Sequence, residues 1–182
     1  PDCTGEDECT LTVDIDVDTG NVCPGDTATL TAAVAGGFDP PLTYLWSNGE
    51  TTESIMVSPD ATTTYGVTVT AGGPGTCVDS AMTTITLLPL PTVTIDSVFC
   101  ADDSLSYSAI VSVTDADAVT VNSGALPGDP AGDQTFTVTG IDLDSTLIVT
   151  TSNQCGEASD MSMAPDCTGE DECTLTVDID VD

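Results

Sequence analysis

The chain has 182 residues, of which 31 are Asp or Glu and none is Lys, Arg or His, so its formal net charge is −31 at pH 7. This charge makes nucleic acid and anionic membrane surfaces poor partners, favours divalent cations, and leaves no cationic side chain for an internal ion pair. Because 40% of the residues are hydrophobic, a core can still form, although no apolar run approaches the roughly 20 residues that cross a bilayer.

Short strands separated by turns are expected from the beginning of the chain. In residues 12–18, TVDIDVD, the apolar and acidic side chains alternate and therefore point to opposite faces of a strand. Further apolar and Thr-rich strands are expected at residues 26–35, 42–47, 52–58, 62–70 and 77–88, separated by Gly, Pro, Asn and Asp. This spacing predicts an antiparallel β-sandwich.

A second set of strands follows Pro89 and Pro91, which predict a short, stiff linker. Its expected strands are residues 92–98, 104–113, 117–123, 133–140, 145–151 and 157–163. The two sets share a cysteine pattern, with CPGDT at 23–27 corresponding to CADDS at 100–104. We interpret them as diverged copies of one sandwich, so the fold prediction is all-β with two sandwiches in tandem.

An exact repeat organises the whole chain. Residues 1–18, PDCTGEDECTLTVDIDVD, recur without change as residues 165–182, which indicates a window from an array with a period of 164 residues (165 − 1). The expected divisions are an inter-repeat disulfide loop at 1–9, a first domain at 10–88, a second domain at 89–164, and the start of the next repeat at 165–182. Because the chain opens on Pro1, a precursor with targeting signals is expected outside it.

The cysteines indicate disulfides and an oxidising, extracellular compartment. Two of the eight cysteines belong to the repeated segment, so one period carries six, an even number. The expected disulfide cysteines are Cys3, Cys9, Cys23, Cys77, Cys100, Cys155, Cys167 and Cys173. Near-equal spacing favours the pairs Cys23–Cys77 and Cys100–Cys155, with Cys3 and Cys9 closing a small loop, although six cysteines permit many connectivities.

Residues 42–70, LTYLWSNGETTESIMVSPDATTTYGVTVT, carry a family resemblance. The stretch resembles the immunoglobulin-like or PKD-like tandem repeats of giant cell-surface adhesins and gliding-type proteins of Bacteroidota. The resemblance implies two immunoglobulin-like sandwiches per repeat, with Trp46 in the core on the third strand and Tyr65 at the start of the penultimate strand. It also implies secretion and a stalk or adhesive role, with no catalytic residue.

The acidic face of the first strand is the feature most open to chemistry. Strand geometry places the carboxylates of Asp14, Asp16 and Asp18 about 6.8 Å apart, where they repel one another unless they are solvated or share a cation. Ca²⁺, which accepts six to eight oxygen ligands, is the natural candidate. Two interpretations stay open, a solvated strand face and a Ca²⁺ site. The residues Glu6, Asp7 and Glu8 in the small disulfide loop are a second candidate.

Catalysis is not expected in this chain. Without His or Lys, triad, Cys-His and Schiff-base chemistry are excluded, and the single DTG at residues 18–20 lacks the second loop that an aspartic protease needs. Five D-[S/T] tripeptides resemble the O-glycosylation signal of Bacteroidota, although coincidence is expected in a chain so rich in Asp, Ser and Thr. Their acceptors are Thr27, Ser80, Ser97, Ser104 and Ser145.

The sequence therefore predicts a non-enzymatic structural repeat of an extracellular filament, stalk or fibre. Its partners would be adjacent identical repeats or chains, together with divalent cations. One alternative is a cell-surface adhesin that binds carbohydrate or protein, for which Phe38 is the exposed aromatic candidate. Another is a subunit that polymerises by strand exchange, in which the repeated strand completes the sheet of a neighbour.

Overall fold

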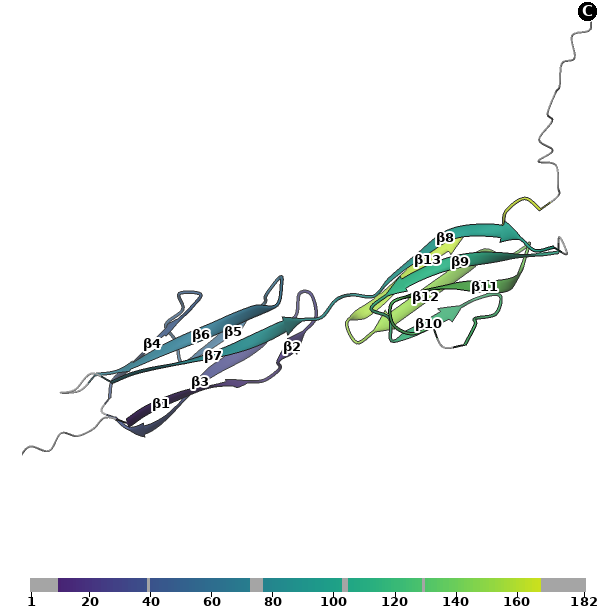
Figure 1. The fold of residues 1–182 in the computed structure, drawn as a ribbon. Coiled ribbons are helices and arrows are strands. Elements are labelled where there is room, and N and C mark those ends of the chain that lie inside the picture. Colours follow the sequence, from purple (N-terminus) through teal and green to yellow (C-terminus); the bar gives the residue numbers. More distant parts are fainter. Residues whose placement is uncertain (1–9, 39, 73–76, 103–104, 129, 168–182) are drawn as a thin grey trace, which may run out of the picture. The chain divides into compact units, whose positions relative to one another are not determined.

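The computed structural model describes residues 10–38, 40–72, 77–102, 105–128 and 130–167. The chain divides into two compact units, Pro1–Pro89 and Leu90–Asp182. The described residues form thirteen strands and no helix, and nothing in this part of the chain could cross a membrane as an apolar helix (Figure 1). Each unit is an immunoglobulin-like β-sandwich, so the predicted fold class is confirmed.

The first unit consists of two sheets. One sheet has the order β1-β3-β5, formed by Thr10–Val17, Ala28–Gly37 and Ser54–Val57, with antiparallel neighbours. The other has the order β2-β7-β6-β4, formed by Asn21–Val22, Cys77–Leu87, Thr63–Ala71 and Leu42–Trp46. The two-residue strand β2 is parallel to β7, whereas the other neighbours in this sheet are antiparallel.

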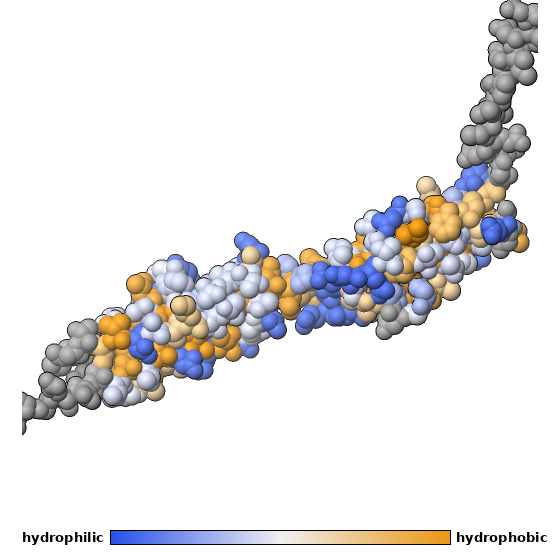
Figure 2. Space-filling model, viewed as in Figure 1, coloured by the Kyte–Doolittle hydropathy of each residue, from blue (hydrophilic) through white to orange (hydrophobic). Residues whose placement is uncertain are grey.

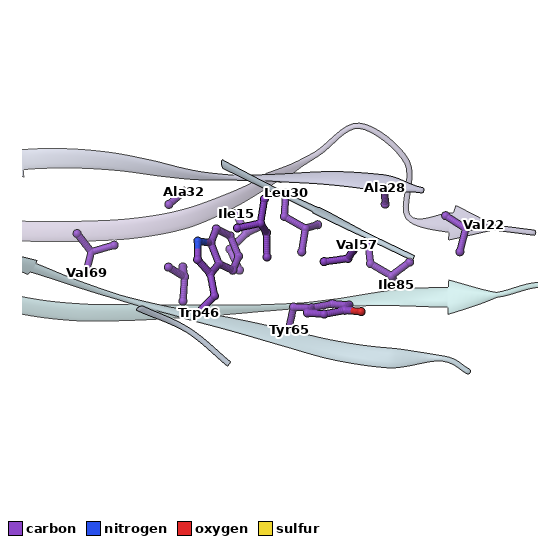
Figure 3. Close-up of a cluster of buried hydrophobic side chains, with 12 residues drawn as sticks. Ile15, Val22, Ala28, Leu30, Ala32, Trp46, Val57, Tyr65, Val69 and Ile85 are labelled. Atoms are coloured by element: carbon purple, nitrogen blue, oxygen red, sulfur yellow. The ribbon is translucent and has the colours of Figure 1, made fainter. Parts of the chain in front are cut away.

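The core of the first unit lies between these sheets. Leu30 and Ala32 point into it from β3, and Trp46 and Tyr65 lie across from them on β4 and β6 (Figure 3). Trp46 is only 2% exposed, and its indole N–H donates to the carbonyl oxygen of Thr52 at 2.8 Å. Tyr65 lies on the penultimate strand of the unit, as the family resemblance implies. Trp46 falls on the fourth strand in chain order because β2 is a separate short element.

The second unit repeats the arrangement with two three-stranded sheets. One has the order β11-β9-β8, formed by Gln134–Asp142, Ser106–Thr114 and Thr92–Cys100. The other has the order β10-β12-β13, formed by Ala118–Val121, Leu147–Asn153 and Gly156–Ser162. Its core contains the fully buried side chains of Tyr107, Val111, Val138, Ile141, Leu147 and Val149. The Tyr107 hydroxyl donates to the Ser145 carbonyl oxygen at 2.9 Å, and burial raises the pKa of this phenol.

Each unit links its first strand to its last strand through one half-buried carboxylate. In the first unit the backbone amide of Val13 on β1 donates to Oδ2 of Asp79 on β7 at 2.8 Å. In the second unit the amide of Ile95 on β8 donates to Oδ2 of Asp160 on β13 at 2.7 Å. These carboxylates join strands that belong to opposite sheets, so each one helps to close its sandwich.

Candidate functional site

The acidic strand β1 lies at the edge of its sheet, with Asp14 and Asp16 on the exposed side and Ile15 in the core. Oδ1 of Asp14 accepts the amide of Ile15 at 2.8 Å, so this carboxylate bonds to its own strand. The alternation that predicted an acidic face is therefore present, and the carboxylates lie in a row along an exposed strand.

Asp18, which follows β1, has a structural role at the end of the β1-β3 ladder. Its Oδ1 accepts the amides of Thr29 at 2.8 Å and of Thr19 at 2.7 Å, and its own amide donates to the Thr29 carbonyl oxygen at 3.3 Å. The hydrogen bond from the Thr29 amide is the main reason that the pKa of Asp18 lies below its ordinary value of 3.8, with burial acting in the opposite direction. Asp18 is thus engaged by the backbone.

Within the ranges that the structure describes, no three Cys, Asp or Glu side chains gather closely enough to hold a metal ion. A row of carboxylates on one strand supplies oxygen ligands from a single side, whereas Ca²⁺ takes six to eight ligands around it. Glu6, Asp7 and Glu8 lie outside the described residues. Calcium binding at either acidic segment stays a prediction.

One disulfide joins the second unit to the repeated segment. Cys100, at the end of β8, is bonded to Cys167, with the two Cα atoms 5.6 Å apart. Residues 165–182 are the second copy of residues 1–18, so Cys167 is the counterpart of Cys3. A closed loop of this length stabilises a fold by about 4 kcal/mol in the chain-entropy account. Cys23, Cys77 and Cys155 are also disulfide-bonded.

The predicted pair Cys100–Cys155 is wrong, because Cys100 is bonded to Cys167, and Cys167 therefore does not close a small loop with Cys173. The reason is positional. Cys100 lies opposite Tyr107, at one end of the β8-β9 ladder. Cys155 lies in the β12-β13 turn, where Asn153 donates to the Asp115 carbonyl oxygen beside the other end of that ladder. Eight residues of strand separate the two ends by about 27 Å.

The predicted pair Cys23–Cys77 fails for the same reason. Cys23 directly follows β2, whose last residue, Val22, lies beside Leu87 at the end of β7. Cys77 is the first residue of that same strand. Ten residues of strand place the two cysteines about 33 Å apart, whereas a disulfide requires Cα atoms about 4.4–6.8 Å apart.

The candidate glycosylation residues differ in exposure. Thr27, Ser80 and Ser97 are exposed, Ser145 is half-buried, and Ser104 lies outside the described residues. The three exposed hydroxyls are therefore the accessible members of the set, and their modification stays a prediction.

The second unit carries a surface hollow of about 550 Å³. It is lined by Ala125, Leu126, Pro127, Gln134, Thr135, Phe136, Thr137 and Thr139. Apolar groups, hydroxyls and one amide line this hollow, so it suits a neutral ligand. Phe38, the aromatic candidate of the sequence, is half-buried in the first unit and contributes nothing to this hollow.

Two structurally important carboxylates, Asp79 and Asp160, were not identified by the sequence analysis. Both lie in the cysteine-flanked segments that the two halves share, CVDSAM and CGEASDM. A carboxylate at an inward-facing strand position within a duplicated segment is the signal that could have identified them.

No protein-family model matches the chain, and no curated protein sequence matches it. Among solved structures, it is similar to immunoglobulin domains 1 to 4 of Sidekick-1, with 12% identity, a TM-score of 0.46, and coverage of 84% of this chain and 48% of that one. A three-immunoglobulin structure of titin gives 10% identity, a TM-score of 0.46, and coverage of 83% and 63%. The chain thus spans about half to two thirds of the length of these structures.

Proposed function

We propose that this chain is a structural repeat of an extracellular filament, stalk or fibre, in which disulfide-bonded β-sandwiches carry mechanical load. The observation that carries the proposal is the bond between Cys100 and Cys167, because it joins the second sandwich to a segment identical with the one that leads into the first. In a continuous array, each copy of this cysteine would bond to the preceding sandwich. Adjacent repeats would then be connected by both the backbone and a disulfide.

The mass of the native protein under denaturing and reducing conditions tests this proposal. A very large chain, or a ladder whose steps match the repeat, is expected for a covalent array. A single species near 18.4 kDa would contradict the array and favour discrete subunits that exchange the repeated strand.

Calcium binding to the acidic strand β1 forms part of the proposal, since a bound cation would offset part of the repulsion within a chain of net charge −31. The melting temperature measured in Ca²⁺ and in a chelator tests it, with Asp14→Asn/Asp16→Asn as the comparison variant. A higher melting temperature in Ca²⁺, reduced in the variant, is expected. Equal melting temperatures in Ca²⁺ and chelator would remove calcium from the proposal.

An adhesin is the second candidate function, and the uncharged hollow in the second unit is the observation that favours it. Its lining of hydroxyls, an amide and an aromatic ring suits a carbohydrate or a neutral peptide segment. Binding to a glycan array by the intact chain, lost on Gln134→Ala, would support this function. Identical glycan binding by wild type and Gln134→Ala would count against the hollow as the ligand site.

A further inference from the structure

One sheet face of the first unit presents no acidic side chain. The strands β2, β4, β6 and β7 contain a single acidic residue, Asp79, and its carboxylate is turned towards β1, where it accepts the Val13 amide. Each of the other three sheets exposes at least one acidic strand residue. These residues are Asp14 and Asp16 in the first unit, and Asp96, Asp142 and Glu157 in the second.

We call this surface the uncharged face, and it consists of the outward side chains of β4, β6 and β7. Its members are Thr43, Leu45, Thr64, Gly66, Thr68, Thr70, Val78, Ser80, Met82, Thr84 and Thr86. In a chain that averages one acidic residue in about six, eleven neighbouring surface positions without any acid form a distinct region.

The uncharged face is partly apolar. Leu45, Val78 and Met82 are 57%, 59% and 77% exposed, so each has apolar surface that a partner could cover. Met82 lies over Gly66, where its Cγ would be 3.5 Å from an added Cβ. Figure 2 shows hydrophobic residues exposed on the viewed surface of both units.

The hydroxyls on this face are partly satisfied by one another, since Thr64 and Thr84 share a hydrogen bond of 2.8 Å across β6 and β7. Burial of the apolar groups is favourable, and the shared hydrogen bond satisfies one of the two hydroxyl donors of Thr64 and Thr84, so covering this face desolvates no charge. The uncharged face is therefore suited to contact with a second uncharged surface.

We propose that the uncharged face binds the same face of a second copy of this chain. Two copies with net charge −31 and no cationic side chain have no complementary charges to bring together. Contact through any acidic sheet face would place carboxylates against carboxylates at reduced hydration, whereas pairing of the uncharged faces buries no charge. A basic partner would bind the acidic faces instead, whereas a second copy presents a matching surface without acidic side chains.

The size of the face determines the strength of the contact. Strands β4, β6 and β7 have five, nine and eleven residues, and at a spacing of about 4.8 Å they give roughly 400 Å² per copy, below the ~800 Å² of a stable interface. One repeat should therefore pair weakly, and an array should pair strongly because many weak contacts act together. This lateral contact deepens the proposed filament function, but pairing of a single repeat does not depend on it.

Sedimentation equilibrium of the intact 182-residue chain, up to about 1 mM, tests this contact in the concentration range expected for so small an interface. The weight-average mass should rise with concentration. It should rise more at about 0.5 M NaCl, where screening weakens repulsion between the acidic faces. No concentration dependence at either salt level would overturn the proposal.

Matched variants locate the contact. Met82→Glu places a charge on the uncharged face and should weaken association roughly tenfold. Met56→Glu adds the same charge at a side chain that is 68% exposed on the outer face of β5, and should change association by less than about twofold. Circular dichroism would check that both variants fold.

An equal loss of association in both variants, or a loss of association in Met56→Glu alone, would contradict the proposal. The denaturing mass measurement of the array reports on neither outcome, so the two proposals fail separately.

Discussion

Asp79 and Asp160 show how a chain without cations can still use its carboxylates in the interior. Each accepts a backbone amide from the first strand of its unit, at 2.8 and 2.7 Å, and the amide provides the positive end of a dipole where other proteins place Lys or Arg. The inward-facing positions of Asp79 and Asp160 distinguish them from the exposed carboxylates, and their hydrogen bonds depend on which strands become neighbours across the sandwich. Sequence alternation alone does not contain that information.

Replacing Asp79 should destabilise the fold because the backbone amide of Val13 loses its hydrogen-bond acceptor. Asp79→Ala leaves the Val13 N–H half-buried without its acceptor and should lower the free energy of unfolding by about 1–3 kcal/mol. Asp79→Asn retains an acceptor oxygen and should cost less. Urea denaturation measures both, with the exposed Asp16→Ala as a control expected to stay within about 0.5 kcal/mol. A loss in Asp16→Ala as large as that in Asp79→Ala would contradict the role of the buried bond.

Asp18 should give the folded state a measurable pH dependence. Its pKa is lowered, chiefly by the Thr29 amide, so its ionised form stabilises the folded state above the unfolded pKa of 3.8. That contribution is lost as the pH falls through the lower folded value. The stability difference between wild type and Asp18→Asn should be constant from about pH 7 to 5 and shrink between about pH 4 and 2.

The difference between these two proteins is the diagnostic quantity, because protonation of the other carboxylates also relieves repulsion across the chain. Denaturation curves of both proteins over this pH range provide it. A difference that does not vary with pH would show that the bonds to Asp18 do not depend on its charge.

At the scale of strands, sequence reasoning predicted twelve of the thirteen elements that the structure describes. Alternation worked because each long strand has one face in a core, as in β6, where Tyr65, Val67 and Val69 are buried between exposed or half-buried residues. Strand β2 escaped because two residues are too few to show a period. Its existence depends on parallel pairing with β7, a contact made by a strand far along the chain.

The pairing of β1 with β3 requires a glycine at one position. Gly36 has φ +112°, and a Cβ added there would lie 1.5 Å from the Thr10 carbonyl oxygen. Gly36→Ala should therefore destabilise the first unit by about 2 kcal/mol or more, through backbone strain and displacement of β1. Gly20→Ala is the matched control, since no atom lies within 4 Å of its added Cβ. Thermal unfolding of both variants provides the comparison, and equal melting temperatures would contradict this account.

At the scale of the whole chain, the sequence revealed the duplication of residues 1–18 at 165–182, but it did not reveal the disulfide connectivity. The near-equal spacing from Cys23 to Cys77 and from Cys100 to Cys155 is part of the pattern that the two halves share, and it does not reflect which cysteines bond to each other. Pairing instead depends on which end of a sandwich each cysteine occupies, and the members of both predicted pairs occupy opposite ends. Spacing along the sequence carries no information on that point.

The bond between Cys100 and Cys167 shortens the path that a pulling force takes through the chain. Tension applied at the two termini runs through β8 to Cys100 and crosses the disulfide to Cys167, so strands β9 to β13 are bypassed even if their sandwich opens. Pulling single molecules by their ends should show this directly. Reduction of all the disulfides, including the one formed by Cys155, should add about 220 Å of extensible chain from the enclosed segment. An oxidised molecule that already releases this length would contradict the bypass.

The residues between Cys100 and Cys167 therefore carry no tension while the disulfide is intact. An applied force can distort the sandwich formed by these residues, but it cannot extend them into an unfolded chain until the bond is reduced. In a fibre made of such segments, strands β9 to β13 of each copy would add no length under strain in oxidising surroundings and would extend once a reductant reached the bond.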